Sequence, residues 1–186
     1  MLISINNITK IHESTMQAGQ IGKAGLIGAA LLALVGCDEG APFGQQTFRA
    51  QYAVARQSLE NGHYEKAERS YQRLLAQAGP LTPRIRLEYA HLLLRKGEFS
   101  QAAAQAGSLA GSQKGAARAA ALSVQATAEH EMALQLLAEG DRVRGKQYLV
   151  KADKGMADVL KKHPELDPIG GLAARRASIK VRKAAL

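Results

Sequence analysis

The stretch from Leu59 to Leu74 decides the fold of this 186-residue chain; it reads Leu-Glu-Asn-Gly-His-Tyr-Glu-Lys-Ala-Glu-Arg-Ser-Tyr-Gln-Arg-Leu. The same spacing of glycine, aromatic, small and large residues recurs later, and Gly97 lies 35 residues after Gly62. The corresponding residues are Leu59, Gly62, Tyr64, Ala67, Tyr71 and Leu74 in the first copy and Leu94, Gly97, Phe99, Ala102, Ala106 and Leu109 in the second. A repeat of this length is typical of stacked helical hairpins and not of a sheet.

Each position of the repeat has a physical role in a hairpin. Glycine ends the first helix in a left-handed turn that other residues adopt only at a cost. The aromatic residue two positions later fills the elbow, and the small Ala67 or Ala102 lets the two helices cross closely. The composition agrees, because a chain with eight Phe and Tyr residues, no Trp and many alanines favours packed helices. We therefore predict an all-α fold.

Helices are expected over residues 46–60, 64–77, 83–96, 100–109, 116–138 and 142–162. Thr82 and Asp141 are predicted to cap two of these helices at their N-termini, and residues 107–115 form a glycine-rich loop. The last pair is a degenerate third repeat, because it has Gly145 at the small position but no elbow aromatic. Asp167 and Pro168 are expected to start one further helix that continues to the end of the chain.

The two copies resemble the tetratricopeptide repeat (TPR) family in their small, aromatic and proline positions. The resemblance covers residues 46–162 and implies a short α-solenoid of antiparallel helical hairpins. Such a stack needs an end cap with one apolar stripe and one polar face, and residues 165–186 are expected to provide it. The cations of this basic end helix are Arg175, Arg176, Lys180, Arg182 and Lys183.

The N-terminal segment has the pattern of an export signal. Residues 24–36 are an uncharged, mostly apolar run that follows Lys23 and precedes the single cysteine, Cys37. A membrane-spanning helix needs roughly 20 such residues, whereas a signal-peptide core needs about 7–15. The run resembles a bacterial lipobox, which implies a signal peptide over residues 1–36, acylation of Cys37 and a tether over residues 37–45. The alternative is a buried free thiol, and translation from Met16 is our hypothesis for the true start.

Motifs for catalysis or cofactor binding are not found in the sequence. The five histidines share no metal-ligand spacing, and no phosphate loop or nucleophile elbow is present, so we expect no enzyme, no metal site and no cofactor. The net charge of +9 raises nucleic acid, anionic lipid and acidic protein as partners. The export signal and the lack of aromatic residues among the basic ones argue against nucleic acid.

In the TPR family the first helices of successive hairpins line a groove that binds a peptide or helix. The positions that this resemblance carries over are Arg49, Tyr52, Arg56, Arg84, Leu87, His91, Arg95, Thr127, His130 and Leu134. A groove with four guanidinium groups favours carboxylate-bearing ligands. The alternative is that these arginines are ordinary solvated helix residues.

Two functions therefore remain open at the level of the sequence. The first is a membrane-tethered scaffold that binds an acidic protein or peptide partner, similar to bacterial lipoproteins of pilus, secretion or envelope assembly. The second is a structural protein whose basic end helix associates with anionic lipid or another envelope surface. Both place the protein in the cell envelope facing the periplasm, and Asp38 after the cysteine resembles an inner-membrane retention signal. The sequence leaves the partner and the oligomeric state open.

Overall fold

The structure is a computed structural model that describes residues 43–186, and within this range the chain forms seven α-helices and no strand. The predicted signal peptide, Cys37 and the first part of the tether lie outside the described residues. The all-α prediction is confirmed. The helices are α1 (Phe43–Glu60), α2 (Tyr64–Gln77), α3 (Thr82–Lys96), α4 (Phe99–Ser112), α5 (Gly115–Ala138), α6 (Arg142–Lys162) and α7 (Gly171–Ala184), with short 3-10 turns at Gly79–Leu81 and Pro164–Leu166.

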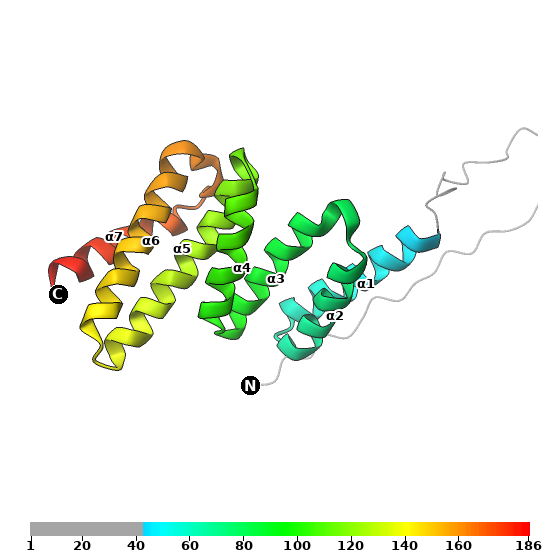
Figure 1. Cartoon of the computed structure of the whole chain (residues 1–186), viewed down its shortest axis with the longest axis horizontal. Coiled ribbons are helices and arrows are strands. Elements are labelled where there is room, and N and C mark those ends of the chain that lie inside the picture. Colours follow the sequence, from blue (N-terminus) through cyan, green and yellow to red (C-terminus); the bar gives the residue numbers. More distant parts are fainter. Residues whose placement is uncertain (1–42) are drawn as a thin grey trace, which may run out of the picture. The chain divides into compact units, whose positions relative to one another are not determined.

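Glycines end the first helix of each hairpin, as the repeat predicts. Gly62, Gly97 and Gly140 have φ values of 76°, 87° and 85°, in the left-handed region where an L side chain is strained. The N–H of Gly97 donates to the carbonyls of Leu93 and Leu94, so it satisfies the end of α3. These turns reverse the chain from α1 into α2, from α3 into α4 and from α5 into α6 (Figure 1).

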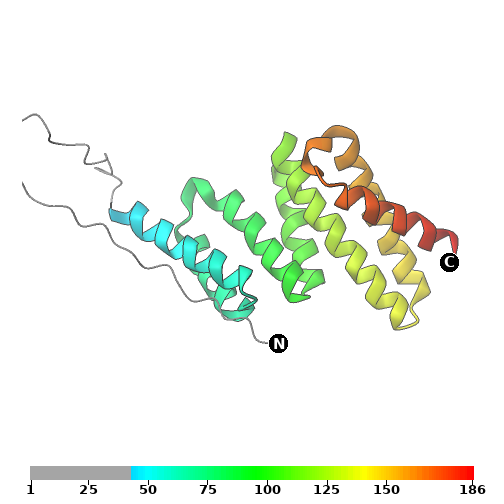
Figure 2. The same ribbon diagram turned by 180° about the vertical axis from the view of Figure 1, so that it is seen from behind.

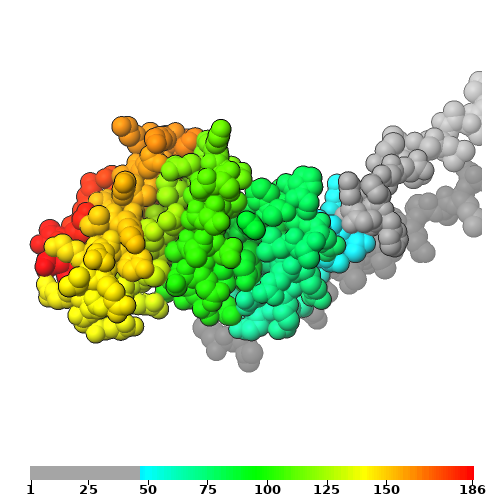
Figure 3. All heavy atoms as spheres, in the orientation of Figure 1, coloured from blue at the N-terminus to red at the C-terminus, as the bar shows by residue number. Residues whose placement is uncertain are grey.

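The helices pack mainly against their neighbours in the chain, from α1 to α7, and α3 also contacts α5. Figure 2 shows this succession from behind, and Figure 3 shows the atoms of successive helices following one another in the same order. Ala67 and Ala102 are fully buried where each hairpin closes. Gly145 is also buried, and a Cβ atom there would lie 2.6 Å from Cγ of Leu137. The small positions of the repeat therefore lie at close helix crossings.

Four local predictions need correction. Helix α1 begins at Phe43, inside the predicted tether. Thr82 is the first residue of α3 and not its cap, because its hydroxyl donates to the carbonyl of Gly79 at 2.7 Å. Helix α4 continues to Ser112, so most of the predicted loop is helical; its glycines and small residues are compatible with a helix that packs closely.

The fourth correction concerns the last helix, which begins at Gly171 and not at Asp167. The carboxylate of Asp167 accepts the backbone N–H groups of Leu172 and Ala173, each at 2.9 Å. It therefore caps α7 from the preceding turn. Asp141 caps α6 as predicted, since its carboxylate accepts the N–H of Arg144 at 2.9 Å.

The core changes in character along the chain. Around α1, α2 and α3 it contains larger side chains, including Tyr71, Leu74, Ile85 and Tyr89. Between α5, α6 and α7 the buried residues are Ala126, Ala133, Leu149, Ala152, Met156 and Ile179. None of the helices in the described part of the chain has the length and apolar character needed to cross a membrane.

Candidate partner-binding surfaces

A single carboxylate, Glu88 on α3, lies at the centre of the predicted groove. Its side chain is only 13% exposed. The hydroxyl of Tyr52 on α1 donates to Oε1 at 2.5 Å, and the hydroxyl of Tyr71 on α2 donates to Oε2 at 2.9 Å. Two arginines of the predicted groove also approach it, with Nη1 of Arg56 3.5 Å from Oε2 and Nε of Arg84 3.7 Å from Oε1. Three helices therefore meet at one acidic side chain.

Glu88 changes the electrostatics of this surface. Burial, followed by the hydrogen bond and charge of Glu88, raises the pKa of Tyr52. Burial and then the charge of Glu88 likewise raise the pKa of Tyr71, so both phenols stay neutral donors. Arg56 also pairs with Glu60 at 2.9 Å. Two of the four arginines that were expected to recruit a partner's carboxylate, Arg56 and Arg84, are thus already paired within the chain.

The other predicted residues on α1 and α3 differ in their availability. Arg49, His91 and Arg95 are exposed, and among the described residues no carboxylate pairs with Arg49 or Arg95. The guanidinium of Arg95 lies 5.9 Å from the ring centroid of Tyr64. Leu87 is half-buried and packs against a cluster formed by Ala90, Ala106 and Val124, so it belongs to the core.

The predicted groove residues on α5 do not form an open surface. His130 is only 5% exposed, and its Nδ1 lies 3.0 Å from Nη1 of Arg175 on α7. Burial, with a further contribution from Arg175, lowers the pKa of His130. The hydroxyl of Thr127 donates to the carbonyl of Ser123 at 2.8 Å, and Leu134 is half-buried. His130 is therefore buried in this structure, where Arg175 of α7 contacts it, and its ring is not exposed to a partner.

The basic end helix is partly neutralised by acidic residues of α5 and α6. Arg175 pairs with Glu131, while Arg176 and Lys183 each place a nitrogen 2.8 Å from the carboxylate of Asp153. Lys180 and Arg182 are exposed and form no ion pair within the described residues. Three of the five cations thus attach α7 to the rest of the protein, which reduces the charge that α7 offers to a lipid surface.

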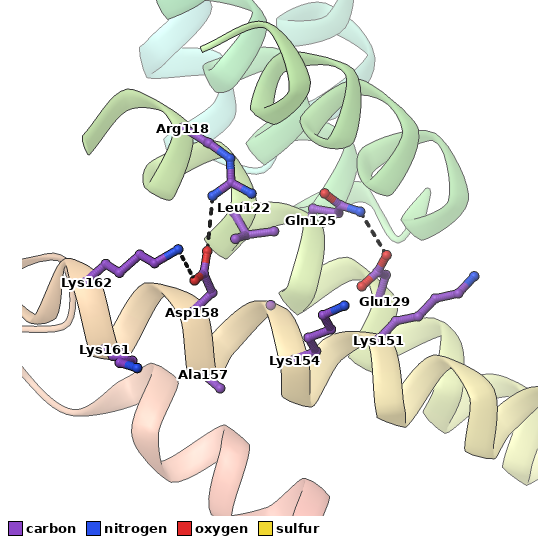
Figure 4. Close-up of a pocket in the computed structure, with 11 residues that line it drawn as sticks. Arg118, Leu122, Gln125, Glu129, Lys151, Lys154, Ala157, Asp158, Lys161 and Lys162 are labelled. Carbon is purple, nitrogen blue, oxygen red and sulfur yellow. Dashed lines mark hydrogen bonds and ion pairs between the residues drawn. The ribbon is translucent and has the colours of Figure 1, made fainter. Parts of the chain in front are cut away.

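A hollow between α5 and α6 is a further candidate surface, and the sequence analysis did not find it. Its cavity volume is about 740 Å³, and Figure 4 shows its lining. The lining residues are Arg118, Leu122, Gln125, Glu129, Lys151, Lys154, Gly155, Ala157, Asp158, Lys161 and Lys162. We call this the α5–α6 hollow. Its five cations outnumber its two carboxylates.

Four of the five cations of the α5–α6 hollow fall into two pairs. Arg118 and Lys162 share Asp158, at 3.1 and 2.6 Å from its two oxygens (Figure 4). These two hydrogen bonds, that of Lys162 first, lower the pKa of Asp158. Lys154 and Lys161 have no carboxylate partner in the part of the chain that the structure describes. They remain available for an incoming anion.

The second carboxyl group of the hollow has a different environment. Glu129 is only 9% exposed, and its Oε1 accepts a hydrogen bond from Nε2 of Gln125 at 3.0 Å. Burial raises the pKa of Glu129. The nearby ammonium of Lys151 lies 4.7 Å from the ring centroid of Tyr148. Within the described residues no lysine or arginine forms an ion pair with Glu129, whereas Arg56 and Arg84 both approach Glu88.

One half of the hollow has a sequence signal. Lys151, Lys154, Asp158 and Lys161 recur at helical spacing along α6, which places them on one face. The other half comes from α5, and the pairing of the two helices is not visible in the spacing of either one.

Among the described residues, no group of three acidic, histidine or cysteine side chains is arranged to hold a metal ion. Comparison with family models, curated proteins and solved structures finds no match to this chain.

Proposed function

We propose that the protein is a lipid-anchored docking scaffold of the bacterial cell envelope that binds an acidic protein segment on α1 and α3. The proposal includes a TPR-like solenoid of helical hairpins and attachment through an acylated Cys37. Its chemical support is the arginine-rich surface, and the lipobox and repeat pattern of the sequence support the anchor and the fold.

The observation that carries the proposal is the set of contacts around Glu88. Tyr52, Arg56 and Arg84 surround the carboxylate of Glu88, so a partner's carboxylate depends on the neighbouring arginines that Glu88 leaves unpaired. Arg49 precedes Tyr52 by one helical turn, and Arg95 follows Glu88 by two turns. Neither has an internal carboxylate partner among the described residues. We infer that these two arginines, on either side of the Glu88 contacts, supply the charge for a partner.

The test reverses the charges of Arg49 and Arg95, which form no ion pair within the described residues. Arg49→Glu with Arg95→Glu should weaken binding of a synthetic glutamate-rich peptide by roughly tenfold, because the peptide then meets two negative charges in place of two positive ones. Isothermal titration calorimetry with the purified protein measures this affinity. The variant should unfold at nearly the wild-type temperature, since no described ion pair is lost.

The matched control is Arg69→Glu with Arg73→Glu on α2. These arginines are also exposed and unpaired within the described residues, and the net charge changes by the same amount. Their reversal should change the affinity less than about twofold, as expected for charges away from the binding surface. An equal loss in the two variants would show that the peptide responds only to net charge, and the proposal would fail.

A further inference from the structure

The lining of the α5–α6 hollow contains apolar residues and an excess of positively charged ones. Leu122 of α5 and Ala157 of α6 contribute apolar surface, and Gly155 lies between the helices. A Cβ atom on Gly155 would lie 2.9 Å from Cβ of Ala126, so the helices are in close contact at this point. The hollow is thus backed by a tight helix crossing.

The free cations of the hollow have a defined spacing. Lys154 and Lys161 are seven residues apart on α6, which corresponds to two helical turns and a rise of about 10.5 Å. Both therefore project from one side of the helix. Because Arg118 and Lys162 share Asp158, that end of the hollow is locally compensated, whereas Lys154 and Lys161 are not.

We propose that the α5–α6 hollow binds an acidic amphipathic helix of a partner protein, as a second docking surface independent of α1 and α3. Carboxylates seven residues apart on the incoming helix match the spacing of Lys154 and Lys161. The apolar side of the same helix lies in the hollow against Leu122. Burial of that apolar contact contributes binding free energy that charge alone does not supply.

The observations favour a protein helix over a membrane. The lysines line a concavity of about 740 Å³ together with Leu122. A layer of lipid headgroups is flat, so it leaves the inside of this concavity uncovered. Glu129 and Asp158 also lie in the hollow, and they oppose a continuous layer of phosphate while tolerating separate carboxylates placed beside the lysines.

The experiment uses the full chain with Cys37→Ser in every sample, so that no acyl chain is attached. The probe is a synthetic 18-residue helix with leucines along one face and glutamates seven residues apart beside them. Lys154→Glu with Lys161→Glu should weaken its binding by about tenfold or more, measured by fluorescence anisotropy, because both matching charges become repulsive. These lysines have no described ion pair, so the variant should retain the wild-type circular dichroism spectrum and melting temperature.

Two controls separate this surface from general charge and from the surface of α1 and α3. Lys66→Glu with Lys180→Glu reverses two exposed lysines, unpaired among the described residues, that do not line the hollow and should change the affinity less than about twofold. Arg49→Glu with Arg95→Glu should weaken binding of the helix much less than Lys154→Glu with Lys161→Glu. Loss of helix binding in that variant alone would assign the peptide to α1 and α3 and overturn the second surface.

Two further results would overturn the proposal. The first is equal binding of a scrambled peptide with the same composition, since a helix with separate apolar and acidic faces would then be unnecessary. The second concerns vesicles that contain phosphatidylglycerol. If Lys154→Glu with Lys161→Glu abolishes vesicle binding while the acidic helix does not bind the unreversed protein, the hollow recognises lipid headgroups and not a protein helix.

Discussion

The region around α1, α2 and α3 and the region around α5 and α6 are both basic. They differ in how their basic side chains are paired with carboxylates. In the first region, Glu88 receives two tyrosine hydroxyls and approaches Arg56 and Arg84. In the second, Lys154 and Lys161 have no carboxylate partner among the described residues. Net charge alone therefore does not locate an anion-binding surface, because an internal carboxylate decides how much of the charge is free.

The packing of each region explains the difference. The first core buries tyrosines, and a buried hydroxyl needs a hydrogen-bond acceptor. Glu88 is that acceptor for Tyr71, which is fully buried, and it also attracts the nearby arginines. Where α5 and α6 are in close contact, Ala126 and Gly155 meet, and they bring no polar side-chain atoms that need a partner. This contact requires no carboxylate, and Lys154 and Lys161 remain unpaired in the described part of the chain.

The largest effect on stability is expected when the carboxylate of Glu88 is neutralised. Glu88→Gln should lower the free energy of unfolding by about 2 kcal/mol, because charge-assisted hydrogen bonds to a partly buried carboxylate are lost. Urea denaturation followed by circular dichroism measures it. Glu129→Gln is the matched control in the second region and should lose less than about 0.5 kcal/mol, since only Gln125 donates to that carboxyl group. Similar losses at the two positions would contradict the proposed difference between the regions.

A smaller effect is expected at the close helix crossing. Gly155→Ala should destabilise the protein by about 1 kcal/mol, because overpacking against Ala126 exceeds the gain in helix propensity. Gly111→Ala is its counterpart in α4, where a Cβ atom meets no atom within 4 Å. That substitution should stabilise by about 0.5 kcal/mol through helix propensity. Thermal melting of the two variants gives opposite shifts, and stabilisation by both would show that α5 and α6 separate readily.

The smallest effect is a pH dependence. Burial raises the pKa of Glu129 above its ordinary value of 4.5, so the folded protein holds this proton more tightly than the unfolded chain. Its ionised form therefore costs stability above the raised pKa, and that cost disappears as the pH falls through the raised value to below 4.5.

Glu129→Gln removes this titration. The free energy of unfolding of the wild-type protein minus that of the variant should therefore increase as the pH is lowered through this window. Urea denaturation of both proteins across the acidic range measures the difference. A difference that decreases on acidification would mean that the folded state stabilises the ionised carboxylate of Glu129, and the prediction would fail.

Much of the secondary structure could be predicted because its signals are local. The bounds of α2 and α6 agree with the prediction, and Gly62, Gly97 and Gly140 form the left-handed turns. The errors lie where a residue type suits two conformations. Small and glycine residues of α4 suggested a loop but are also compatible with a helix, and Thr82 is found inside a helix end that it was expected to cap.

The candidate sites were less predictable because they depend on contacts between distant residues. Arg56 and Arg84 were predicted to share a basic groove, but Glu88 also lies there, and its role depends on how α1, α2 and α3 meet. His130 was assigned to the same groove, yet Arg175, 45 residues later in the chain, contacts it. The α5–α6 hollow could not be predicted because its lining is formed only where α5 and α6 pack together.

Most of the helices and the three glycine turns could be predicted from the sequence, because helical periodicity, proline and glycine act over a few neighbouring residues. The sequence also determined the excess of positive charge. Which cations are neutralised and which remain free depends on the tertiary structure, because ion pairs such as Arg175 with Glu131 join residues 44 positions apart in the chain. The availability of a charge is a property of packing, and residue spacing alone does not contain it.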